Sequence, residues 1–466
     1  MRYNSPTIQL LVLAAVLLLT TALRRLLTTY LVDDVPTDMN LVYDSYWPTS
    51  LVACLSGFIG IFLVNLAGAR CILLFYSFTS IILFASIVSR YQSGSSVFYK
   101  VATILDSLGY DLGRVATLVL VLAYPSERWK ARCLALFLLM EYFSMTFGDL
   151  ISMREYHNEQ KRLHVAIAGL VITCLSPFVA MAIAPSHKVV RDNGVYLVAR
   201  KTTFAEELCG TRAIFKNKYM LLLLPYMFSY PFLFGAANVP FPTILAIICY
   251  DMGKIFIVLM SLTLDIPWAS RRTRGLVSLV MLTVFCVTSI AVTIAMRLMP
   301  IHMEGIDPKW TLSEVNDYIF DGITKRYNGL LLTSYFFAGI ASSFVELFGF
   351  WIIGTLTNDI KTSGRFVGTF HSAMSIGGMV GYQMVTNIPH KYTTSNVPTY
   401  ISSGLTLVSF ILVYFIVRRL ADTNDWTLGI IASNEAGRNS SSEQSTVATT
   451  VVADVKYQHM DEDAQP

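Results

Sequence analysis

The stretch SLVACLSGFIGIFLVNLAGA (Ser50–Ala69) decides the fold, because it is long, apolar and free of charged side chains. A helix that crosses the hydrocarbon core of a bilayer needs ~20 predominantly apolar residues. Similar stretches recur along the chain, which is 54% hydrophobic and only 14% charged over 466 residues. A water-soluble core cannot absorb this excess of apolar residues. The chain is therefore predicted to be an all-α protein that crosses the membrane many times.

About twelve stretches are predicted to span the bilayer. In chain order they are Thr7–Leu23, Ser50–Ala69, Cys71–Val88, Ala102–Ala123, Leu134–Ile151, Val165–Ala184, Tyr219–Phe234, Thr243–Leu264, Leu276–Met296, Gly329–Thr355, Val367–Val385 and Ile401–Val417. The first could also be the apolar region of a signal peptide, but its charges lie mainly after the apolar run, at Arg24 and Arg25, and no clear small-residue cleavage site comes after it. We favour a span whose two arginines extend to the membrane surface.

The connections between spans predict the orientation. With a cytoplasmic N-terminus, the inside connections collect Arg70, Arg128, Lys130, Arg132, Lys188, Arg191, Arg200, Lys201, Arg212, Lys216, Lys218, Arg271, Arg272, Arg274, Lys361 and Arg365. The longest outside connection, Pro300–Tyr327, balances its few cations with acidic residues. Because cytoplasmic loops carry an excess of Lys and Arg, we expect both termini in the cytoplasm. The host membrane is either the plasma membrane or that of a vacuole-like organelle.

The spacing of the connections indicates two halves. Asn65–Arg70 (NLAGAR) resembles Asp265–Arg274 (DIPWASRRTR), since each starts polar and ends basic, and Tyr124–Arg132 (YPSERWKAR) has its counterpart in Thr357–Arg365 (TNDIKTSGR). Parallel repeats of this kind build two-bundle secondary transporters. The predicted domains are a six-helix bundle (1–184), a cytoplasmic linker (185–218), a second six-helix bundle (219–419) and a disordered, Ser-rich, acidic cytoplasmic tail (420–466).

Ionisable side chains inside the spans are the candidate functional residues, because a charge at bilayer depth costs on the order of 3 kcal/mol unless it is paired or hydrated. Glu346 is the most isolated of them, with only Ser342 and Ser343 as polar neighbours within one helical turn. Such a carboxyl group can couple transport to protons, or it can stay protonated and bond a neighbouring helix.

Four further residues complete the predicted substrate and ion-coupling set. Glu141 has no partner in its own span and needs a cation from another span, such as Arg114, so it is a candidate lock between the bundles. Asp106 is an alternative protonatable group. His371 can titrate near neutral pH, although a histidine near a span end also serves packing or capping.

Two pairs in the spans have i,i+3 spacing, Asp111 with Arg114 and Asp251 with Lys254. This spacing places acid and base on one helix face, where they can neutralise each other or bind a ligand or proton. Gating at the cytoplasmic side is assigned to charged residues of the connections. These are Asp265, Arg271, Arg272, Arg274 and Arg70.

Several motifs are missing from the sequence. There is no G-x-x-x-x-G-K-[ST] phosphate loop, no H-E-x-x-H, no clustered Cys/His set and no G-x-S-x-G elbow. ATP-driven transport and intramembrane catalysis are therefore not expected, nor is a metal, a cofactor or nucleic acid. The expected partners are the lipid bilayer, a small-molecule or ion substrate, and possible membrane proteins.

Five segments resemble one known family. They are YPSERWKARCLALF (Tyr124–Phe137), SHKVVRDNG (Ser186–Gly194), TFAEELCGTRAIFKNKYMLLLLPYMF (Thr203–Phe228), DIPWASRRTRGLV (Asp265–Val277) and FGFWIIGTLTNDIKTSGRFVGTFHSAMSIGG (Phe348–Gly378). In this order they are similar to the uncoordinated-ninety-three-like branch of the major facilitator superfamily, in particular its fungal members. The branch usually has a neutral amide where Glu346 stands and a polar residue where Met374 stands, so substrate specificity is not carried over.

The resemblance implies a twelve-span alternating-access fold. The predicted function is secondary active transport of a small solute, coupled to protons through Glu346 or Asp106. Because the branch also includes non-transporting members, the alternative is an accessory protein that regulates or traffics another membrane protein or an ion channel.

Overall fold

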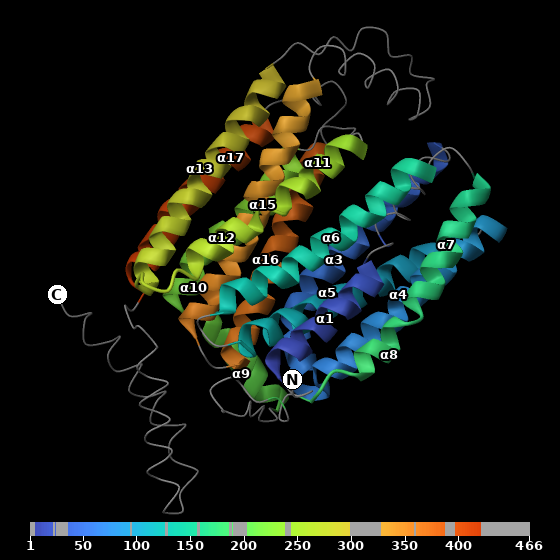
Figure 1. Ribbon diagram of the computed structural model, residues 1–466, viewed down its shortest axis with the longest axis horizontal. Coiled ribbons are helices and arrows are strands. Elements are labelled where there is room, and N and C mark those ends of the chain that lie inside the picture. Colours follow the sequence, from blue (N-terminus) through green and yellow to red (C-terminus); the bar gives the residue numbers. More distant parts are fainter. Residues whose placement is uncertain are drawn as a thin grey trace, which may run out of the picture. The chain divides into compact units, whose positions relative to one another are not determined.

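The computed structural model describes residues 5–21, 24, 36–93, 96–125, 129–155, 159–185, 189, 203–237, 244–298, 328–357, 360–386 and 397–420. In these residues all regular secondary structure is helical (Figure 1), and the helices lie within one compact unit, Met1–Asp422. The predicted outside connection Pro300–Tyr327 and all but the first residue of the predicted tail (420–466) lie outside the described residues.

Each predicted span coincides with one helix or a pair of helices. The helices of the first half are α1 (Pro6–Thr21), α3 (Pro36–Ala67), α4 (Ala69–Ser93), α5 (Ser96–Ala123), α6 (Lys130–Glu155), α7 (Glu159–Thr173) and α8 (Ser176–Met181). Those of the second half are α10 (Lys218–Ala237), α11 (Ile244–Lys254), α12 (Ile257–Leu264), α13 (Arg271–Leu298), α15 (Asn328–Leu356), α16 (Ile360–Thr386) and α17 (Val397–Arg418). Between the halves lies α9 (Phe204–Ile214). Among the described helices, seven are long and apolar enough to cross a membrane on their own.

Two predicted spans are interrupted. The sixth divides into α7 and α8 because Pro177, in the first turn of α8, has no N–H to donate and its ring would clash with the carbonyl four residues earlier. The eighth divides into α11 and α12, where the N–H groups of Ile255 and Phe256 bond carbonyls three residues back, at 3.2 and 3.1 Å. This tighter 3₁₀ pattern keeps the backbone bonded within the membrane.

The helices pack into two groups that meet along two seams. In the first group α5 packs on α3 and α4, and in the second α15 packs on α11 and α13 while α10 packs on α16 and α17. One seam joins α16 to α3 and α5, and the other joins α6 to α11, α12 and α15. The predicted all-α, two-bundle fold is confirmed by this arrangement (Figure 1).

Paired glycines allow the closest helix approaches. A Cβ on Gly57 of α3 would collide with the carbonyl oxygen of Gly368 in α16, and the reverse also holds. Gly253 of α11 and Gly339 of α15 stand in the same relation to the backbone of the facing helix. Small residues at a crossing let two backbones touch, which is the usual source of packing energy between helices in lipid.

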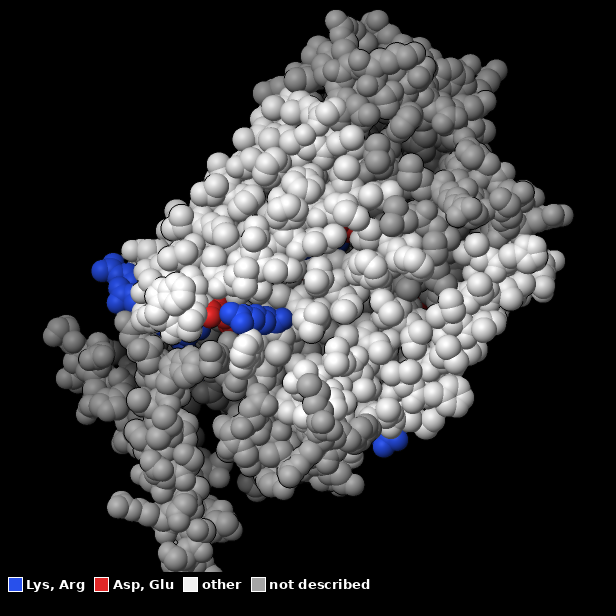
Figure 2. Space-filling model, in the orientation of Figure 1, with Lys and Arg blue, Asp and Glu red and all other residues white. Residues whose placement is uncertain are grey.

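The outer surface is largely uncharged. Figure 2 shows a broad area without Lys, Arg, Asp or Glu, and the cations visible on the described surface gather toward one end of the helices. Exposed apolar side chains such as Val280 and Ile411 cover the helix flanks. This surface suits contact with lipid chains. The end that carries the connections around Arg70, Arg132 and Arg274 is called the basic face below.

Candidate functional site

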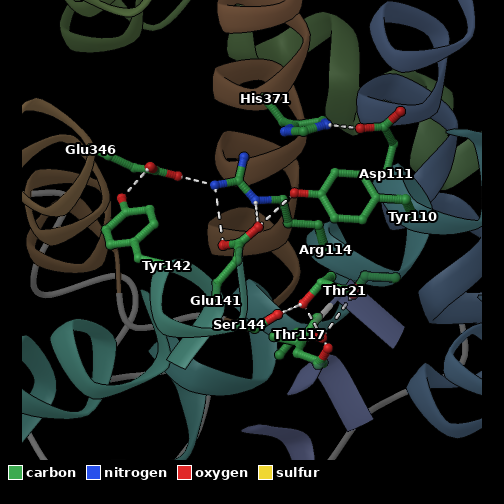
Figure 3. Close-up of polar contacts among 12 residues, drawn as sticks. Thr21, Tyr110, Asp111, Arg114, Thr117, Glu141, Tyr142, Ser144, Glu346 and His371 are labelled. Carbon is green, nitrogen blue, oxygen red and sulfur yellow. Dashed lines mark hydrogen bonds and ion pairs between the residues drawn. The ribbon is translucent and has the colours of Figure 1, made fainter. Parts of the chain in front are cut away.

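Arg114 of α5 joins the two bundles. Its Nε lies 3.2 Å from Oε1 of Glu141 in α6, and its Nη2 donates to the other oxygen of that carboxylate at 3.4 Å. The same Nη2 also pairs with Oε1 of Glu346 in α15 (Figure 3). Helices α5 and α6 belong to the first bundle and α15 to the second, so the guanidinium is shared across the interface.

Two tyrosines complete the carboxylate contacts. The hydroxyl of Tyr110 donates to Oε1 of Glu141 at 2.6 Å, and that of Tyr142 donates to Oε2 of Glu346 at 2.7 Å (Figure 3). Both glutamates are buried. Each carboxylate therefore has one guanidinium and one phenol in place of water, as a buried charge requires.

The contacts continue on both sides of this centre. In the first bundle, the guanidinium of Arg24 lies 4.3 Å from the ring centroid of Tyr110, and its Nε lies 2.8 Å from Oδ2 of Asp106. In the second bundle, Nζ of Lys254 lies 4.7 Å from the ring centroid of Tyr142 and 3.0 Å from Oδ1 of Asp251. We call the resulting sequence of contacts the polar row: Asp106, Arg24, Tyr110, Glu141, Arg114, Glu346, Tyr142, Lys254 and Asp251.

The polar row carries more acids than bases. Its carboxylates are Asp106, Glu141, Glu346 and Asp251, and its cations are Arg24, Arg114 and Lys254. One negative charge is therefore in excess when all of them are ionised. Excess charge inside the membrane is costly, so the row favours the uptake of one proton or one cation.

A second polar contact crosses the bundle interface beside the row. Nε2 of His371 in α16 lies 2.9 Å from Oδ1 of Asp111 in α5 (Figure 3). Next to it, the hydroxyl of Ser372 donates to the carbonyl of Cys54 in α3 at 2.6 Å. His371 is buried, and its Nδ1 has no hydrogen-bond partner among the described residues.

These contacts correct three of the sequence-based predictions. Asp111 bonds His371 rather than Arg114, because the long guanidinium reaches carboxylates on two other helices. Glu346 is not isolated, since its partners come from facing helices that its own sequence neighbourhood does not reveal. Arg24 does not extend to the membrane surface but pairs with the fully buried Asp106, which also accepts a hydrogen bond from another helix. The predicted pair Asp251 and Lys254 is present.

Further contacts join the bundles at the basic face. Oδ2 of Asp265, the residue that ends α12, accepts a hydrogen bond of 3.0 Å from the backbone N–H of Arg132 at the start of α6. Nε of Arg132 lies 3.6 Å from the same oxygen. Beside them, Nζ of Lys130 donates to the carbonyl of Gly354 in the last turn of α15 at 2.9 Å. Burial raises the pKa of Asp265 to about 6, against the opposing effect of the Arg132 contacts.

The other predicted gating residues lie around this contact. Nη1 of Arg274 donates to the carbonyl of Leu264 at 3.0 Å and so caps the end of α12. Arg271 is buried, Arg272 is half-buried and Arg70 is exposed at the start of α4. Of these residues, Asp265 makes the contact between the bundles, and Arg274 bonds the end of α12.

Sequence reasoning missed Tyr110, Tyr142 and Arg24 as members of the site. A signal was present for Tyr142, which directly follows Glu141, and for Tyr110, which lies one helical turn before Arg114. Within the described residues, no group of three or more His, Cys, Asp or Glu side chains could hold a metal ion.

Three solved structures of transporters share this architecture. The fucose:proton symporter FucP of E. coli aligns with 90% of this chain and 100% of its own, with a TM-score of 0.58 and 12% identity. The proton:xylose symporter XylE gives a TM-score of 0.56 at 12% identity, over 88% of this chain and 95% of its own. The human organic anion transporter MFSD10 (TETRAN) gives 0.53 at 12% identity, over 88% and 98%. The chain is thus an all-α, multi-pass membrane protein with the fold of the major facilitator superfamily.

Sequence relatives point to one branch of this class. An UNC93-like protein of Schizosaccharomyces pombe is 25% identical over 288 residues, which are 58% of this chain and 55% of the relative. UNC93-like protein 1 of Arabidopsis thaliana is 24% identical over 323 residues, 64% of this chain and 66% of the relative. No family model matches. The chain matches only about half to two thirds of these relatives' length, and the predicted resemblance to the UNC93-like branch is confirmed.

Proposed function

We propose that this protein is a secondary active transporter that moves a small solute together with protons by alternating access. The observation that carries the proposal is the sharing of Arg114 between Glu141 in its own bundle and Glu346 in the other. Two symporters of the same fold, FucP and XylE, are coupled to protons. The substrate of this chain is a separate question, which those neighbours do not answer.

Proton coupling follows from how the polar row divides between the bundles. When Glu346 is protonated, the remaining charges form the pairs Asp106 with Arg24, Glu141 with Arg114, and Asp251 with Lys254. Each of these pairs lies within a single bundle. The bundles can then separate at this depth without pulling a buried ion pair apart, a step that would otherwise cost several kcal/mol.

A proton on the second interface contact would have the opposite effect. Protonation of His371 gives it a positive charge next to Asp111 and strengthens that contact across the interface. Glu346 releases the bundles when it gains a proton, whereas His371 holds them. The coupling proton is therefore assigned to Glu346, with His371 as a positioning residue.

The test measures ligand-induced stabilisation of the detergent-purified protein at pH 5.5 and pH 7.5 with fucose, xylose, amino acids, nucleosides, organic anions and metal salts. A ligand that binds the folded state raises its stability by mass action. We expect a pH-dependent shift for one compound class, and uptake of that compound into liposomes driven by a pH gradient.

The variant Glu346→Gln keeps the size of the side chain but cannot change its charge. It is expected to retain ligand binding and to lose the pH dependence of uptake, while the control Glu206→Gln, which changes an exposed carboxyl group of α9, behaves as the wild type. If uptake driven by a pH gradient persists unchanged in Glu346→Gln, Glu346 is not the residue that couples transport to protons.

One observation also favours a second function. The cations of the polar row are each paired with a carboxylate of the protein itself, which suits a bundle that stays closed and serves as an accessory to another membrane protein. Cooperative melting without a shift for any compound, together with specific recovery of a membrane protein in a mild-detergent pull-down, would favour this accessory function over transport.

A further inference from the structure

We infer that Glu207 of α9 is a gating residue that connects both bundles to the linker. Its carboxylate replaces the one that the first repeat lacks, because Asn65 stands there. Oε1 of Glu207 accepts a hydrogen bond of 3.0 Å from Nδ2 of Asn65 at the end of α3. Its Oε2 accepts one of 2.9 Å from Nε of Arg365 in the first turns of α16. One carboxylate thus bonds the first bundle on one side and the second bundle on the other.

The comparison of the two repeats explains why this carboxylate is needed. The second repeat offers Asp265 at the start of its basic connection, and this aspartate bonds Arg132, the last residue of the connection Tyr124–Arg132. The reciprocal contact would join Asn65 to Arg365, the last residue of Thr357–Arg365. Asn65 is a neutral amide, so it cannot neutralise a guanidinium that is only 15% exposed. Glu207 provides the missing charge from outside both repeats.

The face of α9 that turns toward the bundles is built for this contact. Gly210 lies one helical turn after Glu207, and a Cβ at that position would collide with the guanidinium of Arg365. Ile214, one turn further, is buried in the same apolar core as Phe366 of α16. The neighbouring Glu206 and Leu208 are exposed. Charge, space and an apolar anchor therefore lie on one side of α9.

The start of α9 is independently held. Thr203 accepts a hydrogen bond from the N–H of Glu206, and the Glu206 side chain accepts one from the N–H of Thr203 in return. This capping box orders the start of the helix through bonds between Thr203 and Glu206 themselves. The two adjacent glutamates therefore differ in role: Glu206 caps the start of α9, and Glu207 contacts both bundles.

Through Glu207, the linker helps to hold the basic face closed. This holds whether the protein is a transporter or an accessory protein. Opening that face requires Arg365 to leave Glu207, just as it requires Arg132 to leave Asp265. The two contacts differ because one depends only on the bundles, whereas the other depends on where α9 lies.

The test is hydrogen exchange, followed by mass spectrometry, on the full-length protein in detergent. Glu207→Ala is expected to speed exchange about 10- to 100-fold at the basic ends of α3 and α16, the range that corresponds to the loss of a charge-assisted hydrogen bond. Glu207→Gln, which keeps the shape and loses the charge, is expected to give a smaller change in the same peptides. The matched control Glu206→Ala is expected to speed exchange in α9 alone.

Rescue separates a gating role from a merely structural one. Asn65→Asp added to Glu207→Ala places a carboxylate at the position that matches Asp265 and is expected to return α3 and α16 toward wild-type exchange while α9 stays fast. The inference is overturned if Glu207→Ala changes exchange only in α9, if Glu206→Ala has the same effect on α3 and α16, or if Asn65→Asp fails to restore their protection.

Discussion

At the scale of single residues, Arg114 shows how a charge is kept inside this membrane protein. It is largely buried, and it satisfies its guanidinium with carboxylates from α6 and α15 rather than with Asp111 of its own helix. Removing one partner of a buried ion pair is costly because it leaves the other charge uncompensated. Arg114 has two such partners, so its loss is expected to matter more than the loss of either glutamate.

The first prediction concerns this residue. Arg114→Met is expected to lower the free energy of unfolding by about 3–5 kcal/mol, because Glu141 and Glu346 stay buried without their cation. Adding Glu346→Gln should recover part of that loss, since one of the two stranded charges disappears. The measurement is the thermal unfolding midpoint in detergent, with a variant of the half-buried Arg272 in the first turn of α13, Arg272→Met, as control. Equal midpoints for Arg114→Met and Arg272→Met would contradict the prediction.

The second prediction concerns pH and Asp265. Because burial raises the pKa of Asp265 to about 6, the folded state holds this proton more tightly than the unfolded state. The resulting stabilisation is complete below about pH 4 and is lost as the pH rises through about 6, by up to about 3 kcal/mol. Unfolding midpoints of the wild type relative to Asp265→Asn should therefore fall between pH 4 and pH 7. A constant difference over this range would show that Asp265 does not titrate there.

At the scale of helices, glycine positions set how closely α3 and α16 approach across the interface. Gly57 and Gly368 face each other with their backbones in contact, so neither position has room for a methyl group. Gly404 of α17 is a natural comparison because a Cβ there would meet nothing within 4 Å. The same amino acid thus has a packing role in α16 and none in α17.

The third prediction follows from this contrast. Gly368→Ala is expected to destabilise the protein by about 1–3 kcal/mol through overpacking at the helix crossing. Gly404→Ala should be neutral or stabilise by up to about 1 kcal/mol, because alanine favours the helix. The two variants are compared by thermal unfolding in the same detergent. A stabilising effect of Gly368→Ala would mean that α3 and α16 do not touch in solution.

At the scale of the whole molecule, the contacts at the basic face involve both bundles and the linker. They comprise Lys130 with Gly354, Arg132 with Asp265, and Arg365 with Glu207. If the positive-inside rule holds for this chain, these contacts close its cytoplasmic side.

The fourth prediction tests that orientation. In sealed vesicles of known sidedness, an epitope tag at the C-terminus and one inserted into the connection Pro300–Tyr327 should react with antibody on opposite sides of the membrane. The C-terminal tag is expected on the cytoplasmic side. Labelling of both tags from one side would contradict the three spans predicted between this connection and the C-terminus.

The sequence by itself determined the helices and the class of fold. A long apolar stretch must bond all its backbone groups to one another inside the membrane, and a helix does so within the stretch itself. The predicted spans therefore lie on helices. It also identified Glu141, Glu346 and Arg114 as charges that need an explanation at bilayer depth. The two interrupted spans show the limit of this reasoning, since hydropathy alone does not distinguish a continuous helix from α11 followed by α12.

Only the tertiary structure decided which charges meet. The partners of Arg114 lie 27 and 232 residues away in the chain, and those of Glu207 lie 142 and 158 residues away. Such pairs depend on which helices cross and at what depth, and local spacing carries no information about either. The i,i+3 rule therefore identified the pair Asp251 and Lys254 and was wrong for Asp111 and Arg114, where carboxylates on neighbouring helices compete more strongly for the guanidinium.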